Sequence, residues 1–166
     1  MVDQRACGKS EGSIITFGVK ESRDCKTWID YTVARFGKDV RILLCGVSMG
    51  ASTVMMAAGR EMPETVIGVL ADCGYSSQRE IIQLVTKNIK LPPKFMYFYI
   101  KLSASLLGGF NIDEYPPIEA LKNCKVPVMF IHGETDDFVP CYMAQKCYIN
   151  CGRFGNDSRY CKILCL

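Results

Sequence analysis

Short apolar runs alternate with helical patterns along this sequence, and no other feature limits the fold as much. The runs have the length of buried strands, and the segments between them repeat apolar or small residues at helical spacing. Strands that alternate with helices form a parallel sheet with helices packed on its faces. We therefore predict an α/β fold, a three-layer αβα domain with a mostly parallel sheet. Strands are expected at 40–45, 66–71, 126–131 and 160–166, and helices at 21–35, 51–60, 77–90 and 94–107.

The 166 residues suit a single domain, 1–166, with its own core. No apolar run approaches the ~20 residues needed to cross a bilayer, and the residues after Met1 lack the apolar segment of a signal peptide. The net charge is only +3 and the basic residues are spread out, so no nucleic-acid partner is expected. These features predict a cytoplasmic protein without a membrane span.

The ten cysteines are many for a chain of this length. Cys45 and Cys73 lie in or beside apolar strand-like runs, where cysteine behaves as a small hydrophobic residue. Five others fall between positions 141 and 165, and their spacings contain no C-x-x-C pair. We expect reduced, mostly structural thiols, with a zinc site as the weaker alternative, and no cofactor.

The segment Gly46-Val47-Ser48-Met49-Gly50 matches the pattern G-x-S-x-G. It falls between an apolar strand and a helix of small residues, which is the strand–turn–helix setting of a nucleophilic serine. A tight turn there strains the serine backbone and lifts its hydroxyl clear of the sheet. Because strand and helix nearly touch, we expect both glycines to be required for their small size. The N–H of Met49 at the helix start would face a developing oxyanion. A glycine-rich turn with an incidental serine is the alternative.

A second polar segment, from Ile131 to Pro140, follows the third predicted strand. Parallel strands end at a common edge of the sheet, so its carboxylates should lie on the same side as Ser48. A carboxylate there can orient a histidine and stabilise its imidazolium. A solvated acidic turn is the alternative interpretation.

A long insertion, at about 77–112, separates the second and third predicted strands. Its second helix carries five consecutive large side chains at 95–99. We favour the interpretation that this helix packs against the sheet. The alternative is a cap over an active site that supplies an apolar wall for the substrate. A helix lying on a membrane surface is a third, weaker alternative.

Three segments together resemble the α/β-hydrolase superfamily, in the branch of prolyl-oligopeptidase-like and serine-aminopeptidase-like hydrolases. Residues 3–12 are similar to the loop after the family's fourth strand, with Ala6 where glycine is commoner. The G-x-S-x-G turn comes next, and the H-G-x-x-D-x-x-V-P segment from His132 to Pro140 completes the series. The resemblance implies a partial α/β-hydrolase fold with a helical cap insertion.

The resemblance also implies roles for individual residues. Ser48 matches the nucleophile, Met49 the donor of one oxyanion N–H, and Asp136 the acid of the catalytic triad, ahead of Asp137 and Glu134. The implied activity is that of a serine hydrolase, esterase- or peptidase-like. It would act on the carbonyl of a small-molecule ester, thioester or peptide substrate through an acyl-enzyme on Ser48.

The triad also needs a histidine, and His132 is the one histidine in the sequence. It matches the structural histidine of its segment, so we expect a local hydrogen bond that fixes the turn carrying Asp136. A role as general base is the alternative.

The family places its base after the last strand and further strands before Asp3, so we predict a partial chain. The edge of the strand at 40–45 would then lie open and could drive self-association. Without the base, turnover should be negligible, because losing a triad member costs ~10⁴-fold. A non-catalytic pseudoenzyme or truncated remnant acting as an interaction module is the alternative function, and acyl transfer in place of hydrolysis stays open.

Overall fold

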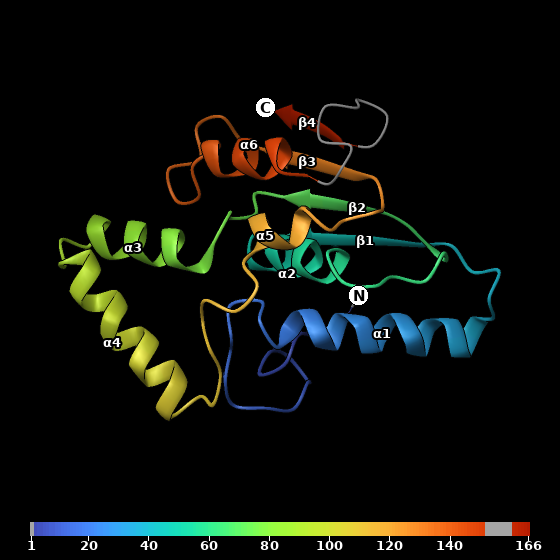
Figure 1. The fold of residues 1–166 in the computed structure, drawn as a ribbon, viewed down its shortest axis with the longest axis horizontal. Helices are drawn as coiled ribbons and strands as arrows, with labels where there is room; N and C mark the ends of the chain where they lie inside the picture. The colour runs from blue at the N-terminus through green and yellow to red at the C-terminus, as the bar shows by residue number, and fades with distance from the viewer. Residues whose placement is uncertain (1, 152–160) are drawn as a thin grey trace.

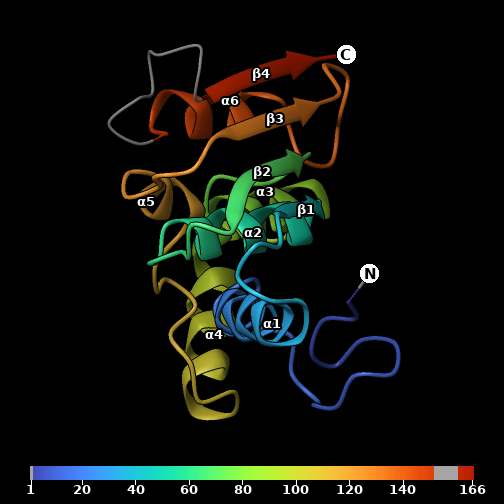
Figure 2. The same cartoon turned by 90° about the vertical axis from the view of Figure 1, so that its right-hand side faces the viewer.

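A computed structural model of the chain describes residues 2–151 and 161–166 and contains a four-stranded parallel sheet (Figure 1). The strands are β1 (Ile42–Val47), β2 (Val66–Asp72), β3 (Val128–His132) and β4 (Cys161–Cys165). They lie in the order β1-β2-β3-β4, stacked from bottom to top in Figure 2, and every neighbouring pair is parallel. The predicted α/β class is therefore confirmed. Position 160, the first residue of the fourth predicted strand, lies outside the described residues.

The helices are α1 (Glu21–Phe36), α2 (Met49–Ala58), α3 (Gln78–Asn88), α4 (Pro93–Leu106), α5 (Pro117–Leu121) and α6 (Tyr142–Ile149). The four predicted helices are α1 to α4. Sequence reasoning missed α5 and α6, which have five and eight residues. Helices this short span too few turns for an apolar period to be visible.

The main core lies between one face of the sheet and the helices α1, α2, α5 and α6. Phe130 of β3 and Met55 of α2 are each 1% exposed, and Leu121 of α5 is fully buried. Burying a side chain of this size contributes ~1.5–3 kcal/mol each. The small residues of α2 let its backbone approach the sheet closely, and Ala51, Ala57 and Ala58 are all buried.

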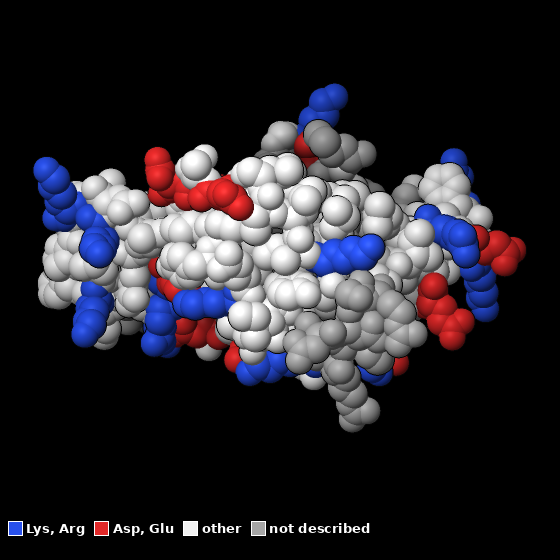
Figure 3. All heavy atoms as spheres, turned by 90° about the horizontal axis from the view of Figure 1, so that it is seen from above, with Lys and Arg blue, Asp and Glu red and all other residues white. Residues whose placement is uncertain are grey.

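The opposite face of the sheet is apolar but exposed. Every second strand residue points to this face, and Leu43, Val47 and Ile67 are 52%, 64% and 45% exposed. Within residues 2–151 and 161–166, helices therefore cover one face only, and the second helical layer of the predicted αβα arrangement is not among them. β1 is an edge strand, as predicted for residues 40–45. Seen from the β4 side, Lys and Arg side chains stand out at both ends of the molecule, and most of the described surface between them is white, with a few charged side chains (Figure 3).

The helices α3 and α4 extend beyond the carboxyl ends of the strands (Figure 1). The buried residues of α4, Tyr97 and Ala104, join a cluster with Ile81 and Ile82 of α3. The favoured interpretation, that the aromatic helix packs against the sheet, is therefore wrong, because α4 packs against α3. Its remaining aromatic side chains are largely exposed, with Phe95, Phe98 and Tyr99 at 58%, 60% and 47%.

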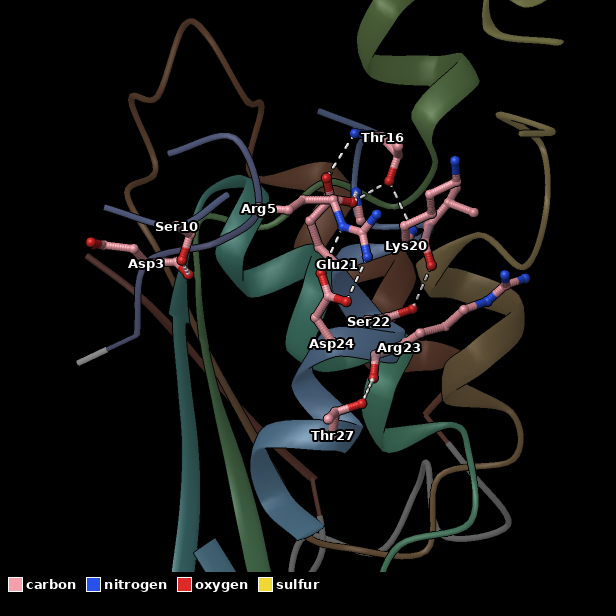
Figure 4. A network of polar contacts seen from close by, with 12 residues as sticks. Asp3, Arg5, Ser10, Thr16, Lys20, Glu21, Ser22, Arg23, Asp24 and Thr27 are labelled. Carbon is pink, nitrogen blue, oxygen red and sulfur yellow. Dashed lines mark hydrogen bonds and ion pairs between the residues drawn. The ribbon is translucent and has the colours of Figure 1, made fainter. Parts of the chain in front are cut away.

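The chain before α1 contains no helix or strand over residues 2–20 and is attached by polar contacts (Figure 4). The guanidinium of Arg5 donates to both carboxylate oxygens of Asp24, at 2.6 and 2.5 Å. Glu21, only 2% exposed, accepts hydrogen bonds from the N–H groups of Thr16 and Gly18 and from the hydroxyl of Thr16. A carboxylate in the first turn also complements the positive end of the helix. These contacts fix the segment against the start of α1.

Candidate active site

Ser48 lies in the turn between β1 and α2, at the carboxyl edge of the sheet. Its backbone has φ 52° and ψ −117°, a left-handed conformation that is strained for a residue with a side chain. Two hydrogen bonds hold it there. The N–H of Ser48 donates to the carbonyl of Asp72 at 2.8 Å, and its own carbonyl accepts from the N–H of Ser52 at 3.1 Å. The side chain is half-buried.

Gly46 makes this tight turn possible. A Cβ added at Gly46 would lie 2.2 Å from the carbonyl oxygen of Gly50 and 2.6 Å from the nitrogen of Ala51. The prediction of a required small residue is confirmed here. It is wrong for Gly50, where an added Cβ would meet only the side-chain nitrogen of Gln4, at 3.9 Å. The close approach is between the Cα of Gly46 and the backbone of Gly50, so only the strand residue must lack a side chain.

Met49 is the first residue of α2. The N–H groups in the first turn of a helix have no partner within that helix and lie at its partially positive end. The side chain of Met49 is half-buried and packs against a cluster that includes residues of α3 and α4. Its backbone N–H, next to Ser48, donates no backbone hydrogen bond within the described residues.

The strand register brings the two predicted segments to one edge. The last residue of β1 pairs with Asp72, which pairs in turn with Ile131 of β3. Ser48, Cys73 and His132 therefore follow at corresponding positions on three neighbouring strands. Strands lie ~4.8 Å apart, so the ends of β1 and β3 are separated by about 10 Å. The sheet places Ser48 and the acidic turn after β3 on the same side of the molecule.

Asp136 is held in that turn by the backbone. Its Oδ1 accepts hydrogen bonds from the N–H groups of Phe138 at 2.9 Å and Val139 at 2.8 Å. Its Oδ2 lies 3.7 Å from Nε2 of His132. The other two candidate acids, Glu134 and Asp137, are exposed. Asp136 is thus the carboxylate whose orientation the turn fixes.

His132 is fully buried, and its Nε2 lies 2.6 Å from the carbonyl oxygen of Val139. A carbonyl can only accept, so Nε2 carries the proton. The expected local hydrogen bond is confirmed, and it joins the end of β3 to the residue that also donates to Asp136. In this tautomer the basic nitrogen is Nδ1, which is buried and has no hydrogen-bond partner among the described residues, so His132 makes no contact through which it could deprotonate Ser48.

Cys73 lies beside the site, although its place in the sequence predicts only a small hydrophobic residue. It follows β2 with φ 46° and lies between the ends of β1 and β3. Burial raises the pKa of its thiol, the N–H of Ser48 acts in the opposite direction, and the charges of Asp72 and Asp136 raise it further. The signal in the sequence was its position two residues after the predicted strand at 66–71.

A groove of about 610 Å³ lies between α3, the start of α4 and Tyr142 of α6. Its lining includes Leu84, Phe95 and two lysines, Lys87 and Lys94. None of the three predicted site residues lines it. Across the described residues, no three histidine, cysteine or acidic side chains are arranged to hold a metal ion. No described helix has both the length and the apolar character to cross a bilayer.

No protein-family model matches the chain. The protein YqkD of Bacillus subtilis (strain 168) is 24% identical over 147 residues, which are 88% of this chain and 48% of YqkD. The chain therefore spans about half the length of this curated relative.

Several solved structures superpose on nearly the whole chain. The Pyrococcus furiosus esterase Pf2001 has a TM-score of 0.69 at 23% identity, over 98% of this chain and 58% of that protein. A lipase-esterase related protein from Clostridium acetobutylicum ATCC 824 has a TM-score of 0.66 at 17% identity, over 99% and 72%. A Mycobacterium tuberculosis puromycin-hydrolyzing peptidase has a TM-score of 0.66 at 16% identity, over 91% and 22%. At these identities the likenesses show the fold alone.

Proposed function

We propose that this chain, which has the α/β-hydrolase fold of esterases and prolyl-oligopeptidase-like peptidases, is part of a serine hydrolase with Ser48 as its nucleophile. The observation that carries the proposal is the φ of 52° at Ser48, between a parallel strand and a helix. Such a conformation costs ~1–3 kcal/mol and is concentrated at functional sites. In the proposed reaction Ser48 attacks the carbonyl of an ester, thioester or peptide, and water releases the acyl-enzyme.

The backbone N–H of Met49 is the proposed donor to the oxyanion. It lies at the start of a ten-residue helix, where the peptide dipoles favour negative charge. The oxyanion of a tetrahedral intermediate on Ser48 would accept a hydrogen bond from this N–H, and the backbone would not need to rearrange. A single donor of this kind is worth ~10²–10³ in rate.

Asp136 is the proposed triad acid. Two backbone N–H groups fix its Oδ1 and leave Oδ2 to accept a hydrogen bond from an imidazole. The exposed Asp137 and Glu134 make no comparable contacts within the described residues. A carboxylate held in this way orients a histidine and stabilises its charged form.

We further propose that α3 and α4 form a cap over this edge of the sheet. Their shared cluster contains Val139, three residues after Asp136, and packs against Met49, next to Ser48. The exposed aromatic side chains of α4 are the candidate apolar wall for the acyl group. The substrate expected on this basis is an ester, thioester or peptide with an apolar group beside the reacting carbonyl.

The proposal includes negligible turnover by these 166 residues. The sequence contains a single histidine, His132, which donates its Nε2 proton to Val139 and whose basic Nδ1 is buried without a partner among the described residues. Absence of the base costs ~10⁴-fold or more. Hydrolysis of a p-nitrophenyl ester that Ser48→Ala abolishes would contradict this part of the proposal.

The test is labelling by a fluorophosphonate probe, with and without added imidazole as an external base. Ser48 should be labelled, imidazole should accelerate the labelling, and Ser48→Ala should remove it. Ser105→Ala is the matched control, because Ser105 is exposed on α4 and should not affect the rate. The labelled residue is identified by mass spectrometry.

Labelling of Ser48 no faster than that of exposed serines, with or without imidazole, would sink the proposal. That outcome would favour the second candidate, a non-catalytic pseudoenzyme that keeps the scaffold. The observation that favours this alternative is the burial of His132, whose basic Nδ1 contacts no polar group among the described residues.

A further inference from the structure

Two thiols, Cys141 and Cys165, meet at the carboxyl edge of the sheet. Their Sγ atoms lie 3.3 Å apart, although the residues are 24 positions apart in the chain. Cys141 immediately precedes α6, and Cys165 is the last residue of β4. Both are partly exposed, so small molecules in solution can reach them.

The surrounding backbone holds the two thiols together. Cys165 pairs with His132 in the parallel register of β3 and β4. The next residue, Leu166, donates its N–H to the carbonyl of His132 at 2.9 Å and accepts from the N–H of Glu134 at 2.7 Å. On the other side, the N–H of Met143 donates to the carbonyl of Pro140 at 2.9 Å. The approach of the two thiols is therefore built into hydrogen-bonded backbone on both sides.

We infer that Cys141 and Cys165 are a redox-active dithiol that closes to a disulfide when it reacts with a low-molecular-weight disulfide such as oxidised glutathione. One protein thiolate attacks a sulfur of the reagent, whose S–S bond breaks and releases one thiolate. The second protein thiolate then attacks the mixed disulfide, forms the Cys141–Cys165 bond and releases the second thiolate. The two protein thiols are oxidised, the reagent is reduced to two thiols, and these take up the two protons.

The surroundings of Cys141 keep its reduced form a neutral thiol. Burial, the neighbouring Cys165, and the charges of Glu134 and Asp136 raise the pKa of Cys141 to about 11. Cys141 is therefore almost wholly a thiol at neutral pH, and a lasting negative charge beside the acidic turn is disfavoured. The disulfide is uncharged as well, so closure places no charge beside the acidic turn, and the attack proceeds through the small deprotonated fraction of the thiols.

The inference does not depend on the proposed hydrolase function, because the exchange uses neither Ser48 nor Asp136. The disulfide would nevertheless affect the edge of the sheet where Ser48 and Asp136 lie. A bond between these sulfurs would tie the start of α6 to the end of β4, on either side of the turn at 133–140. It would therefore restrain the turn that holds Asp136.

The test is to oxidise the folded, reduced chain with glutathione buffers and to map its cysteines. Trypsin suits this sequence, because cleavage after Lys125, Lys146 and Lys162 puts Cys141 and Cys165 on separate peptides with no other cysteine. After free thiols are alkylated and the protein is digested without reductant, the two peptides should be found joined. Both thiols should be lost together, with the mass of two hydrogen atoms. Exposed Cys45, which makes no thiol contact within the described residues, should stop at a mixed disulfide with glutathione.

Single substitutions separate a true pair from general oxidation. In Cys141→Ser, Cys165 should also stop at the mixed disulfide, and Cys165→Ser should leave Cys141 in the same state. Cys45→Ser is the matched control and should leave the joined peptides unchanged. The inference is overturned if the wild-type chain carries glutathione separately on Cys141 and Cys165, if either is joined to another cysteine, or if both stay reduced while Cys45 reacts. Because the mapping of wild-type protein decides these outcomes, the test stands even if a variant fails to fold.

Discussion

Gly46→Ala should be among the most damaging small substitutions in this chain. The added methyl carbon would lie 2.2 Å from the carbonyl oxygen of Gly50, 2.3 Å from its carbonyl carbon and 2.6 Å from the nitrogen of Ala51. All three are backbone atoms, so no side-chain rotation can relieve the overlap. The strand β1 and the start of α2 would have to move apart.

The size of that movement follows from the geometry. Ordinary contact begins at 3.4 Å, so the closest pair must separate by at least 3.4 − 2.2 = 1.2 Å. Residues 51–58 of α2 are all buried, so a shift of the helix disturbs packing along its whole length. Overpacking of a core costs ~1–3 kcal/mol. A clash between two backbones belongs at the upper end, and we expect a loss of about 3 kcal/mol or more from a total stability of ~5–15 kcal/mol.

Urea denaturation followed by circular dichroism measures this loss, with Gly50→Ala as the matched control. Gly50 lies in α2, and the nearest atom to an added Cβ is 3.9 Å away. Alanine there should leave stability unchanged or raise it by up to ~1 kcal/mol, because glycine is a poor helix former. Equal midpoints for the two variants, or a Gly46→Ala chain as stable as wild type, would refute the reasoning.

Three further predictions concern stability. Glu21→Gln should lower the free energy of unfolding by about 1–2 kcal/mol in urea, because the buried carboxylate accepts three hydrogen bonds; an unchanged midpoint would count against that role. Although burial opposes it, hydrogen bonds from a lysine, a tyrosine and an arginine lower the pKa of Asp113 to about 2. Because this folded pKa lies below the unfolded value of ~3.9, its contribution is present above pH ~4 and is lost toward pH ~2. Asp113→Asn should therefore lose less stability than wild type across that range, and parallel acid titrations would contradict the assignment. Gly59→Ala should lower the melting temperature, because the added Cβ would lie 2.2 Å from the carbonyl oxygen of Ala120 on α5. In the control Gly133→Ala the added Cβ meets no atom within 4 Å, so the melting temperature should not fall. Equal melting temperatures for these two variants would show that α2 and α5 are not in such close contact.

Local patterns were sufficient for most of the secondary structure. The apolar runs predicted all four strands, and helical spacing predicted α1 to α4, because both signals depend only on neighbours within a few residues. The parallel arrangement followed from their alternation. The turn at Ser48 was predicted for the same reason, since a strand, two glycines and a small-residue helix are adjacent in the sequence.

Features that depend on which elements meet were decided only by the tertiary structure. The apolar face of a helix can be predicted from the sequence, but the element that it packs against cannot. We therefore predicted that α4 packs against the sheet, whereas it packs against α3. The two glycines on either side of Ser48 are equivalent in the sequence pattern, but only at Gly46 would an added Cβ overlap another part of the backbone.

The sequence likewise did not predict that the thiols of Cys141 and Cys165 lie close together, because their distance depends on how β4 pairs with β3. Periodicity specifies which side of an element is apolar. Contacts between residues far apart in the chain depend on how the elements are placed against one another in three dimensions.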